Sequence, residues 1–170
     1  CEAFGLQDLH TVETLCKFNP NVNIVRGTDK WVDLTRHEST TQAIADLKSA
    51  GYRIVATTPH RESCTPETFD VGKGKFCLVF GTEHAGVSDE IIEAADEYLR
   101  IPMCGMVESL NVSASAAILI YMLSQRMRLT EGLDWQIGGV EHEKILLRWM
   151  MTAVRDSKQI LERKYGERLW

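Results

Sequence analysis

Continuous apolar runs alternate along the chain with segments in which apolar residues recur every three or four positions. Residues 52–57 and 76–80 are apolar runs with β-branched or aromatic content, the pattern of strands buried on both faces of a sheet. Shorter runs at residues 9–12, 31–35 and 98–101 predict three more strands. Because helical segments separate several of these strands, the pattern predicts an α/β fold built on a parallel sheet.

Two helices are predicted between the strands. Thr40 or Thr41 can begin the first helix, and Gly51 can end it. Its apolar positions share one face and are Ala43, Ile44, Leu47 and Ala50. Ser88 is placed to cap a second, shorter helix, whose apolar positions are Ile91, Ile92 and Ala95.

The last third of the sequence predicts further helices. Asn111 and Ser113 are good N-cap residues before a run rich in Ala, Ser, Ile and Leu, which reads as a buried helix. We expect one domain over residues 1–128, a turn-rich linker over 129–140 and a helical extension over 141–170. The apolar residues of this extension fall roughly on one face, and they are Ile145, Trp149, Ala153, Ile160 and Leu161. We expect that face to pack on the domain or on a second subunit.

Composition agrees with one compact domain in a reducing compartment. The 170 residues, 44% hydrophobic and 25% charged, are enough to bury a core without disulfides or metals. The five cysteines are odd in number and form no CxxC pair, so we expect reduced thiols and a cytoplasmic protein. No uninterrupted apolar run reaches the ~18 residues of a membrane span, and no signal peptide is visible.

The net charge of −5 argues mildly against a simple nucleic-acid-binding protein. The distribution is uneven, because residues 141–170 hold seven Lys and Arg against five Asp and Glu. An RNA-contacting extension would have this bias. A solvated face on a terminal amphipathic helix explains it equally well.

The loop before residue 112 is the strongest candidate for a ligand site. It is unusually apolar for a surface turn, and Gly105 allows its backbone to approach a ligand. The apolar members are Met103, Met106, Val107 and Leu110, and the polar members are Glu108, Ser109 and Asn111. Apolar walls with a few placed polar groups are typical of a small-molecule pocket. The alternative is a turn followed by a capped core helix.

Two other strand exits carry polar groups. Residues 78–91 leave a buried strand at Gly81, place Glu83 in a turn and pass Gly86 before a helix N-terminus, which suits an anion or small ligand. Taken alone, this is also the pattern of an ordinary connection, and GxGxxG is absent. Thr57 and Thr58 end another strand, where ligands bind in open α/β sheets.

Two of these segments resemble signature motifs of one enzyme family. Residues 101–123, IPMCGMVESLNVSASAAILIYML, resemble the third motif of the SpoU (TrmH-like) RNA ribose 2′-O-methyltransferases. Residues 78–91, LVFGTEHAGVSDEI, resemble the second motif, GxExxG(V/I), and the two stand in the family's order and spacing. The resemblance covers nearly all of residues 1–128. It implies an α/β-knot (SPOUT) fold in which residues 78–123 thread through a loop as a deep trefoil knot, which periodicity alone would not suggest.

The resemblance also implies a cofactor, a partner and a substrate. The cofactor would be S-adenosylmethionine, with S-adenosylhomocysteine as product and no metal. The implied cofactor contacts are Thr57, Gly81, Ile101, Met106 and Leu110. The protein would be a homodimer that acts on RNA. It is most similar to the tRNA (guanosine-2′-O-) branch, which methylates a D-loop guanosine.

The chemistry requires activation of a weak nucleophile. A ribose 2′-hydroxyl needs help with deprotonation and in-line placement against the methyl group. Asn111, Ser109 and Glu83 are the candidate catalytic residues and can orient the reactants, although none is an obvious strong base. The family's first motif supplies an Asn and an Arg. CEAFG at residues 1–5 resembles the residues just after that Arg, so we expect both to precede Cys1.

Three alternatives remain open from the sequence. The substrate could be rRNA instead of tRNA. The chain could be a catalytically inactive SPOUT-fold protein that binds RNA or assists assembly, although the presence of Glu83, Ser109 and Asn111 together favours the enzyme. A flavodoxin-like metabolite-binding domain would lack the ordered pair of motifs.

Overall fold

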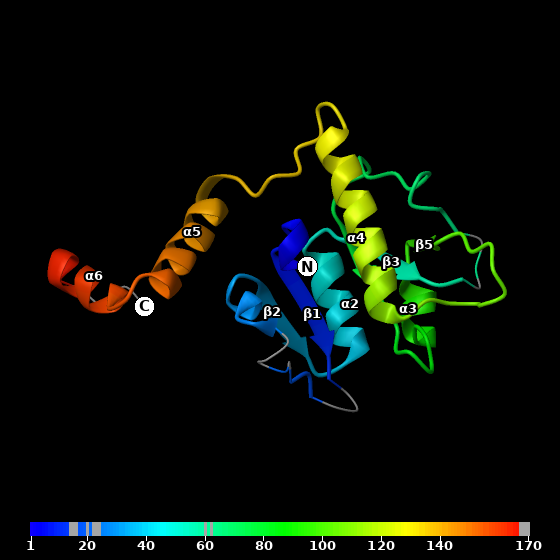
Figure 1. Ribbon diagram of the computed structural model, residues 1–170, viewed down its shortest axis with the longest axis horizontal. Helices are drawn as coiled ribbons and strands as arrows, with labels where there is room; N and C mark the ends of the chain where they lie inside the picture. The colour runs from blue at the N-terminus through cyan, green and yellow to red at the C-terminus, as the bar shows by residue number, and fades with distance from the viewer. Residues whose placement is uncertain (14–16, 20, 22–24, 60, 62, 167–170) are drawn as a thin grey trace.

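The computed structural model describes residues 1–170 except 14–16, 20, 22–24, 60, 62 and 167–170 (Figure 1). Among these described residues, the strands are all parallel and form two sheets. The strands β1 (Asp8–Val12) and β2 (Asp33–His37) form the smaller sheet. The larger sheet has the order β4 (Phe76–Val79), β3 (Arg53–Thr57), β5 (Glu97–Leu99). The α/β class and the parallel pairing are therefore confirmed, whereas the expected single sheet is divided in two.

Strand β3 lies at the centre of the larger sheet because its apolar run can be covered on both faces. Ile54, Val55 and Ala56 have no exposed surface. Successive side chains of a strand point to opposite faces. Val55 therefore packs with one core cluster, and Ile54 and Ala56 pack with another. The prediction of a strand buried on both faces is confirmed for β3, whereas β4, for which the same was predicted, is an edge strand whose residues are half-buried.

Helices cover both faces of this sheet. The cluster on one face joins Val55 to Phe69, Val71, Leu99, Leu119 and Leu123, the last two from α4 (Val112–Leu129). On the other face, Leu47 of α2 (Thr40–Ser49) and Ile91 of α3 (Asp89–Ala94) pack against Ile54 and Ala56. The sheet thus separates α4 from α2 and α3.

Helix boundaries follow the sequence signals with small shifts. Ser39, one residue before the predicted caps, begins α2, and its side chain accepts a hydrogen bond from the Gln42 amide at 3.2 Å. Gly51 follows that helix with a φ of 81°, which favours glycine. Ser88 begins α3, but its side chain makes no capping hydrogen bond. The strands predicted at 31–35 and 98–101 are displaced by one or two residues.

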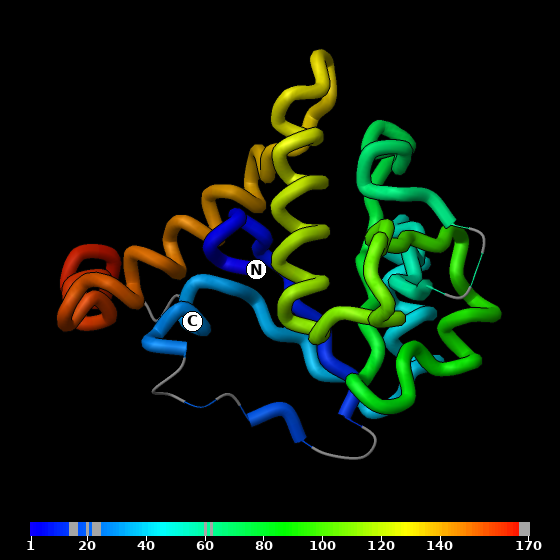
Figure 2. Tube along the Cα trace, turned by 45° about the vertical axis from the view of Figure 1, so that its right-hand side comes forward, coloured from blue at the N-terminus to red at the C-terminus, as the bar shows by residue number. Residues whose placement is uncertain are grey.

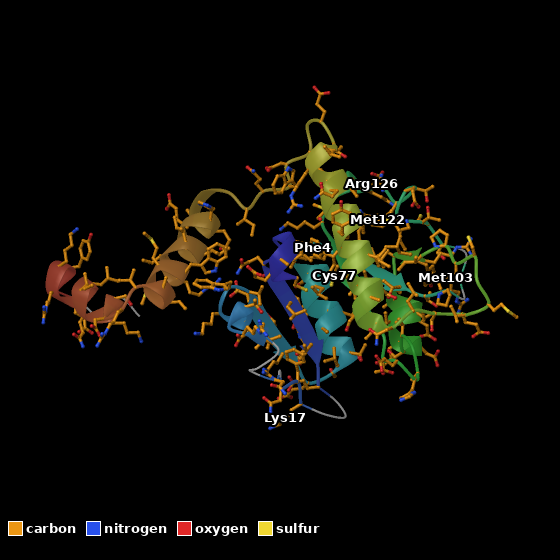
Figure 3. The ribbon with its side chains drawn as sticks, in the orientation of Figure 1. Phe4, Lys17, Cys77, Met103, Met122 and Arg126 are labelled. Carbon is orange, nitrogen blue, oxygen red and sulfur yellow. The ribbon has the colours of Figure 1, made fainter. Side chains whose placement is uncertain are left out.

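The first residues of the chain pack against α4. They form the 3-10 turn η1 (Glu2–Phe4), which ends at Gly5 with a φ of 77°. The Phe4 ring lies 5.9 Å from the ring of Tyr121, and the Arg128 guanidinium donates to the Phe4 carbonyl at 2.7 Å. Figure 3 shows Phe4 beside α4.

The final segment is not the single helix that the periodicity predicted. It forms α5 (Gly139–Ala153) and α6 (Ser157–Tyr165), separated by a break at Asp156, whose φ of 57° is left-handed. Residues 167–170, also included in the predicted helix, lie outside the described residues. The break turns α6 away from the line of α5 (Figures 1 and 2).

Helix α5 packs back on the domain, as one of the two expectations had it. Arg148 forms an ion pair with Asp33 of β2, with Nη2 2.7 Å from Oδ2. The indole of Trp149 meets that of Trp31 edge to face at 6.0 Å, next to the 3-10 turn η2 (Thr28–Lys30). Ile145 is almost fully buried.

The described thiols are free, and burial raises the pKa of Cys77 to about 11. Cys16 lies outside the described residues. Within the described part of the chain, no helix combines the length and the apolar character that crossing a membrane requires.

Candidate functional site

The carboxyl ends of three parallel strands meet at one edge of the larger sheet. Ala56 pairs with Val79, and Thr57 pairs with Leu99, so β3, β4 and β5 end at the same level. The Thr57 hydroxyl donates to the Val79 carbonyl at 2.8 Å, and the Thr58 amide donates to the Leu99 carbonyl at 3.1 Å. Thr57 is one of the predicted cofactor contacts, and its hydroxyl proton forms a hydrogen bond between β3 and β4.

The loop after β4 is closed on itself. The amides of Thr82 and Gly86 each donate to the other's carbonyl at 3.0 Å, and the Thr82 hydroxyl accepts from the Ala85 amide. A Cβ on Gly81 would lie 1.9 Å from the Gly86 carbonyl carbon, closer than any contact allows. Gly86 itself has a φ of 68°. Both glycines of the second motif are therefore required by backbone geometry.

Glu83 and Asn111 bring the second and third motifs together. Asn111 Nδ2 donates to Glu83 Oε1 at 2.6 Å. The other atom of the same amide, Oδ1, accepts from the Ser113 amide at 2.8 Å and caps α4. Because both ends of the amide are engaged, its orientation is determined by the hydrogen bonds. The predicted N-cap is observed.

Ser109 is not part of this contact. It is exposed, and its hydroxyl makes no hydrogen bond to any described residue. The hydroxyl is therefore available to a ligand.

A pocket of about 350 Å³ lies beside these loops. Its lining consists of Pro59 after β3 and the residues after β5, namely Arg100, Ile101, Pro102, Met103, Gly105, Met106, Val107 and Glu108. Figure 3 shows Met103 on the side of the molecule where the loops after β3 and β5 lie. The volume falls within the range of about 300–1,000 Å³ typical of small-molecule sites.

The pocket includes some of the predicted cofactor residues and omits others. Ile101 and Met106 line it, with Met106 fully exposed. Thr57, Gly81 and Leu110 lie outside its lining. Sequence reasoning missed Pro59 and Arg100. Pro59 lies just after the strand predicted over residues 52–57, which was the available signal, whereas Arg100 lies inside the strand predicted over residues 98–101 and carried no such signal.

The pocket wall combines opposite charges with apolar surface in similar measure. Arg100 supplies a cation, Glu108 supplies an anion, and Ile101, Pro102 and Met103 supply apolar surface. Backbone groups at Gly105 are uncovered, because nothing lies within 4 Å of where its Cβ would be. This lining suits a ligand with an apolar ring and a zwitterionic end. No group of metal-ligating side chains occurs among the described residues.

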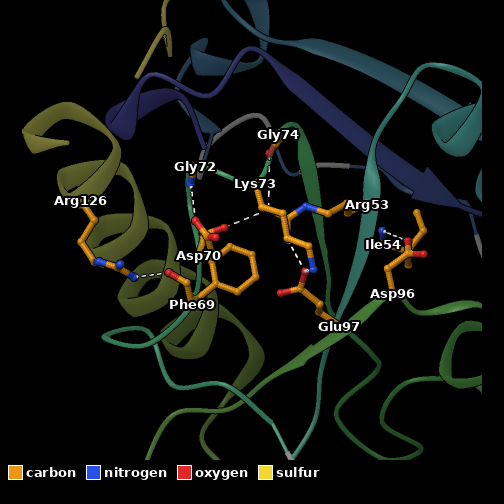
Figure 4. Close-up of polar contacts among 10 residues, drawn as sticks. All are labelled: Arg53, Ile54, Phe69, Asp70, Gly72, Lys73, Gly74, Asp96, Glu97 and Arg126. Carbon is orange, nitrogen blue, oxygen red and sulfur yellow. Dashed lines mark hydrogen bonds and ion pairs between the residues drawn. The ribbon is translucent and has the colours of Figure 1, made fainter. Parts of the chain in front are cut away.

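A charged network holds the opposite end of the sheet (Figure 4). The Glu97 carboxylate accepts from Arg53 and from Lys73, the latter at 2.9 Å. The Arg53 guanidinium also lies 5.2 Å from the centre of the Phe69 ring. From α4, Arg126 donates to the Phe69 carbonyl at 2.7 Å. The network ties β3, β5 and α4 together beneath the loops of the site.

A histidine pair lies in the smaller sheet. His10 Nδ1 and His37 Nε2 are 2.9 Å apart, and His37 Nδ1 lies 3.4 Å from Asp46 Oδ2. Burial, and the neighbouring His37, lower the pKa of His10. This pair could not be predicted from the sequence, because it depends on the alignment of β1 with β2.

Comparisons with known proteins agree with this geometry. The model of the SpoU rRNA Methylase family matches residues 1–121. The tRNA (guanosine(18)-2′-O)-methyltransferase of Aquifex aeolicus is 36% identical over 165 residues, which cover 95% of this chain and 77% of the relative. The protein of the same name from Borreliella burgdorferi is 34% identical, covering 91% of this chain and 70% of its own length. The crystal structure of the A. aeolicus TrmH/SpoU tRNA modifying enzyme is similar with a TM-score of 0.71 and 34% identity, covering 90% of this chain and 79% of that one.

Proposed function

Because this chain belongs to the SpoU rRNA Methylase family, we propose that it transfers a methyl group from S-adenosylmethionine to a ribose 2′-hydroxyl of RNA. The substrate proposed is guanosine 18 of tRNA, which the names of the two relatives specify. The observation that carries the proposal is the contact of Glu83 with Asn111, which joins the second motif to the third, the motif whose residues line the pocket. The proposed activity and the proposed tRNA substrate are those that the sequence motifs favoured.

The pocket residues fit the methyl donor. Ile101 and Met103 would cover its adenine, while Arg100 and Glu108 would meet its carboxylate and ammonium groups. Met106 would lie against the bound molecule. When bound, S-adenosylmethionine would supply the electrophilic methyl group on its sulfonium. Thr57, Gly81 and Leu110 are proposed as further contacts of the methyl donor, and Thr57 and Gly81 would also hold the strand ends and the loop beside the pocket.

The polar residues would place the ribose. The Asn111 side chain donates to Glu83 and accepts from the Ser113 amide at the start of α4. These two hydrogen bonds would hold the Asn111 amide and the Glu83 carboxylate in fixed positions. Ser109 offers an unengaged hydroxyl to the sugar. Holding the 2′-oxygen in line with the methyl group lowers the barrier by removing the need to orient the reactants during reaction.

The larger organisation is proposed on the same basis. Residues 78–123 would form the trefoil knot, supported by the likeness to the A. aeolicus enzyme. Residues 1–128 would form the methyltransferase domain, 129–140 the linker and 141–170 the extension. A cytoplasmic homodimer would cover apolar side chains that α4 and α5 leave exposed, such as Tyr121, Leu147 and Met150.

The test is methyl transfer by the full-length protein to a tRNA transcript, using labelled S-adenosylmethionine. We expect label in the transcript, mapped to the ribose of guanosine 18, and none in a transcript with that guanosine replaced. Methyl transfer to rRNA fragments but not to the tRNA transcript would show that the substrate is rRNA and that the tRNA assignment is wrong. Tight RNA binding with no transfer to either RNA would support the inactive RNA-binding protein instead.

A further inference from the structure

A second pocket, of about 360 Å³, opens between the start of the chain and the C-terminal segment. Its chemically distinctive lining residues are Gln7, Trp135, Gln136, His142, Ile145 and Trp149. The second and third family motifs do not contribute to it, whereas Gly5, from the segment that resembles the end of the first motif, does. In both Figure 1 and Figure 2, α4 lies between the loop over residues 101–111 and helix α5. The second pocket is therefore separate from the site described above.

Two indole rings form the flat surfaces of this pocket. Trp135 is 39% exposed, and the Arg128 guanidinium lies over its ring at 5.3 Å from the centre. Trp149 is held against Trp31 at 6.0 Å. Trp149 is half-buried, so Trp135 offers the more exposed ring, and its supported face can stack against another planar group.

Polar side chains surround the rings. Gln136 and His142 are exposed, and their side chains make no hydrogen bond to other described residues. The Gln7 side-chain amide donates to the Asp33 carboxylate at 3.1 Å, and the Gln7 amide oxygen can still accept a hydrogen bond from a ligand. Amide and imidazole groups can donate and accept in one plane, as the edge of a heterocycle requires. A purely apolar ligand would leave these groups unpaired.

We propose that this pocket binds a nucleobase from an unpaired stretch of the RNA substrate, away from the reacting nucleotide. Proteins recognise unpaired bases by stacking them on aromatic rings and bonding their edges, and this lining supplies both. Arg128 adds a cation beside the ring, suited to the adjoining phosphate. That the ligand is RNA rests on the proposed function.

The test measures binding of short single-stranded oligoribonucleotides that carry 2-aminopurine, whose fluorescence is quenched on stacking. The full-length protein should quench it. Trp135→Ala should weaken binding at least about fivefold, the lower end of the effect of losing one base–aromatic stack. Trp135→Phe should restore most of the affinity, because a planar ring remains. Gln136→Ala should change the preference among bases more than the overall affinity.

Val140→Ala is the matched control, because Val140 is an exposed α5 residue that lies outside the pocket lining. It should leave the quenching intact. Equal binding by Trp135→Ala and the unsubstituted protein, with unchanged circular dichroism, would overturn the proposal. So would a change of mass in light scattering on Trp135→Ala, since the pocket would then be an interface between copies. If methyl transfer fails but quenching still depends on Trp135, the proposed function alone is wrong.

Discussion

Asn111 is expected to contribute separately to stability and to catalysis, and substitutions can divide the two contributions. Asn111→Ala removes the N-cap of α4 and the hydrogen bond to Glu83. Loss of such a cap costs about 1 kcal/mol. For a chain of this size that corresponds to a decrease of roughly 2–4 °C in the melting temperature. Asn111→Ser keeps a capping oxygen, so its stability should stay within about 0.5 kcal/mol of the unsubstituted protein.

Neither substitution preserves the contact between the two motifs. Because small misplacements of reacting groups cost on the order of 100-fold in rate, both variants should slow methyl transfer by about that factor at saturating RNA and cofactor. Asn111→Asp also keeps a cap but sets a second carboxylate against Glu83. At about 4 Å in water, two like charges repel by about 1 kcal/mol, so this variant should open the contact without unfolding α4.

The assay is single-turnover transfer of labelled methyl to the tRNA transcript, with thermal unfolding measured on the same preparations. Glu83→Gln is the matched control, since its amide oxygen can still accept from Asn111, and it should lose less activity than Asn111→Ser. If Asn111→Ser retains a rate within about threefold of the unsubstituted protein, the contact does not position the reactants, and the role assigned to Asn111 in catalysis is wrong.

Three further outcomes are expected. Gly81→Ala should abolish cofactor binding in calorimetry, because its Cβ would lie 1.9 Å from Gly86, and normal binding would contradict the assigned loop geometry. His10 has a pKa lowered by burial and by His37, so the folded state resists protonation. Its contribution to stability should be complete above the ordinary pKa of 6.5 and decrease as the pH falls below it, a slope that His10→Gln should reduce in thermal unfolding. With a pKa of about 11, Cys77 should escape iodoacetamide at pH 8 while the exposed thiols react, as mass spectrometry would show.

The elements that the sequence predicted well are those set by local pattern and burial. Strand β3 has an apolar run that fits only a fully covered position, and Asn111 carries a capping signal that needs no partner from elsewhere. The break at Asp156 was missed because no Gly or Pro marks it and the helical periodicity continues on both sides. The place of Arg100 in the pocket was missed for another reason, since it depends on how two loops meet after folding.

The central place of β3 also affects how the chain emerges from the ribosome. The backbone amide of Ile54 donates to the side chain of Asp96, 42 residues later. The rest of β3 gains its neighbour on that side only when β5 has been made. At a synthesis rate of about 5–20 residues per second, this apolar strand waits about 2–8 s for its partner. Its cover from α4 arrives later still. During nascent-chain growth, β3 is therefore an apolar segment that chaperones can bind, and the order in which the fold closes depends on translation as well as on energy.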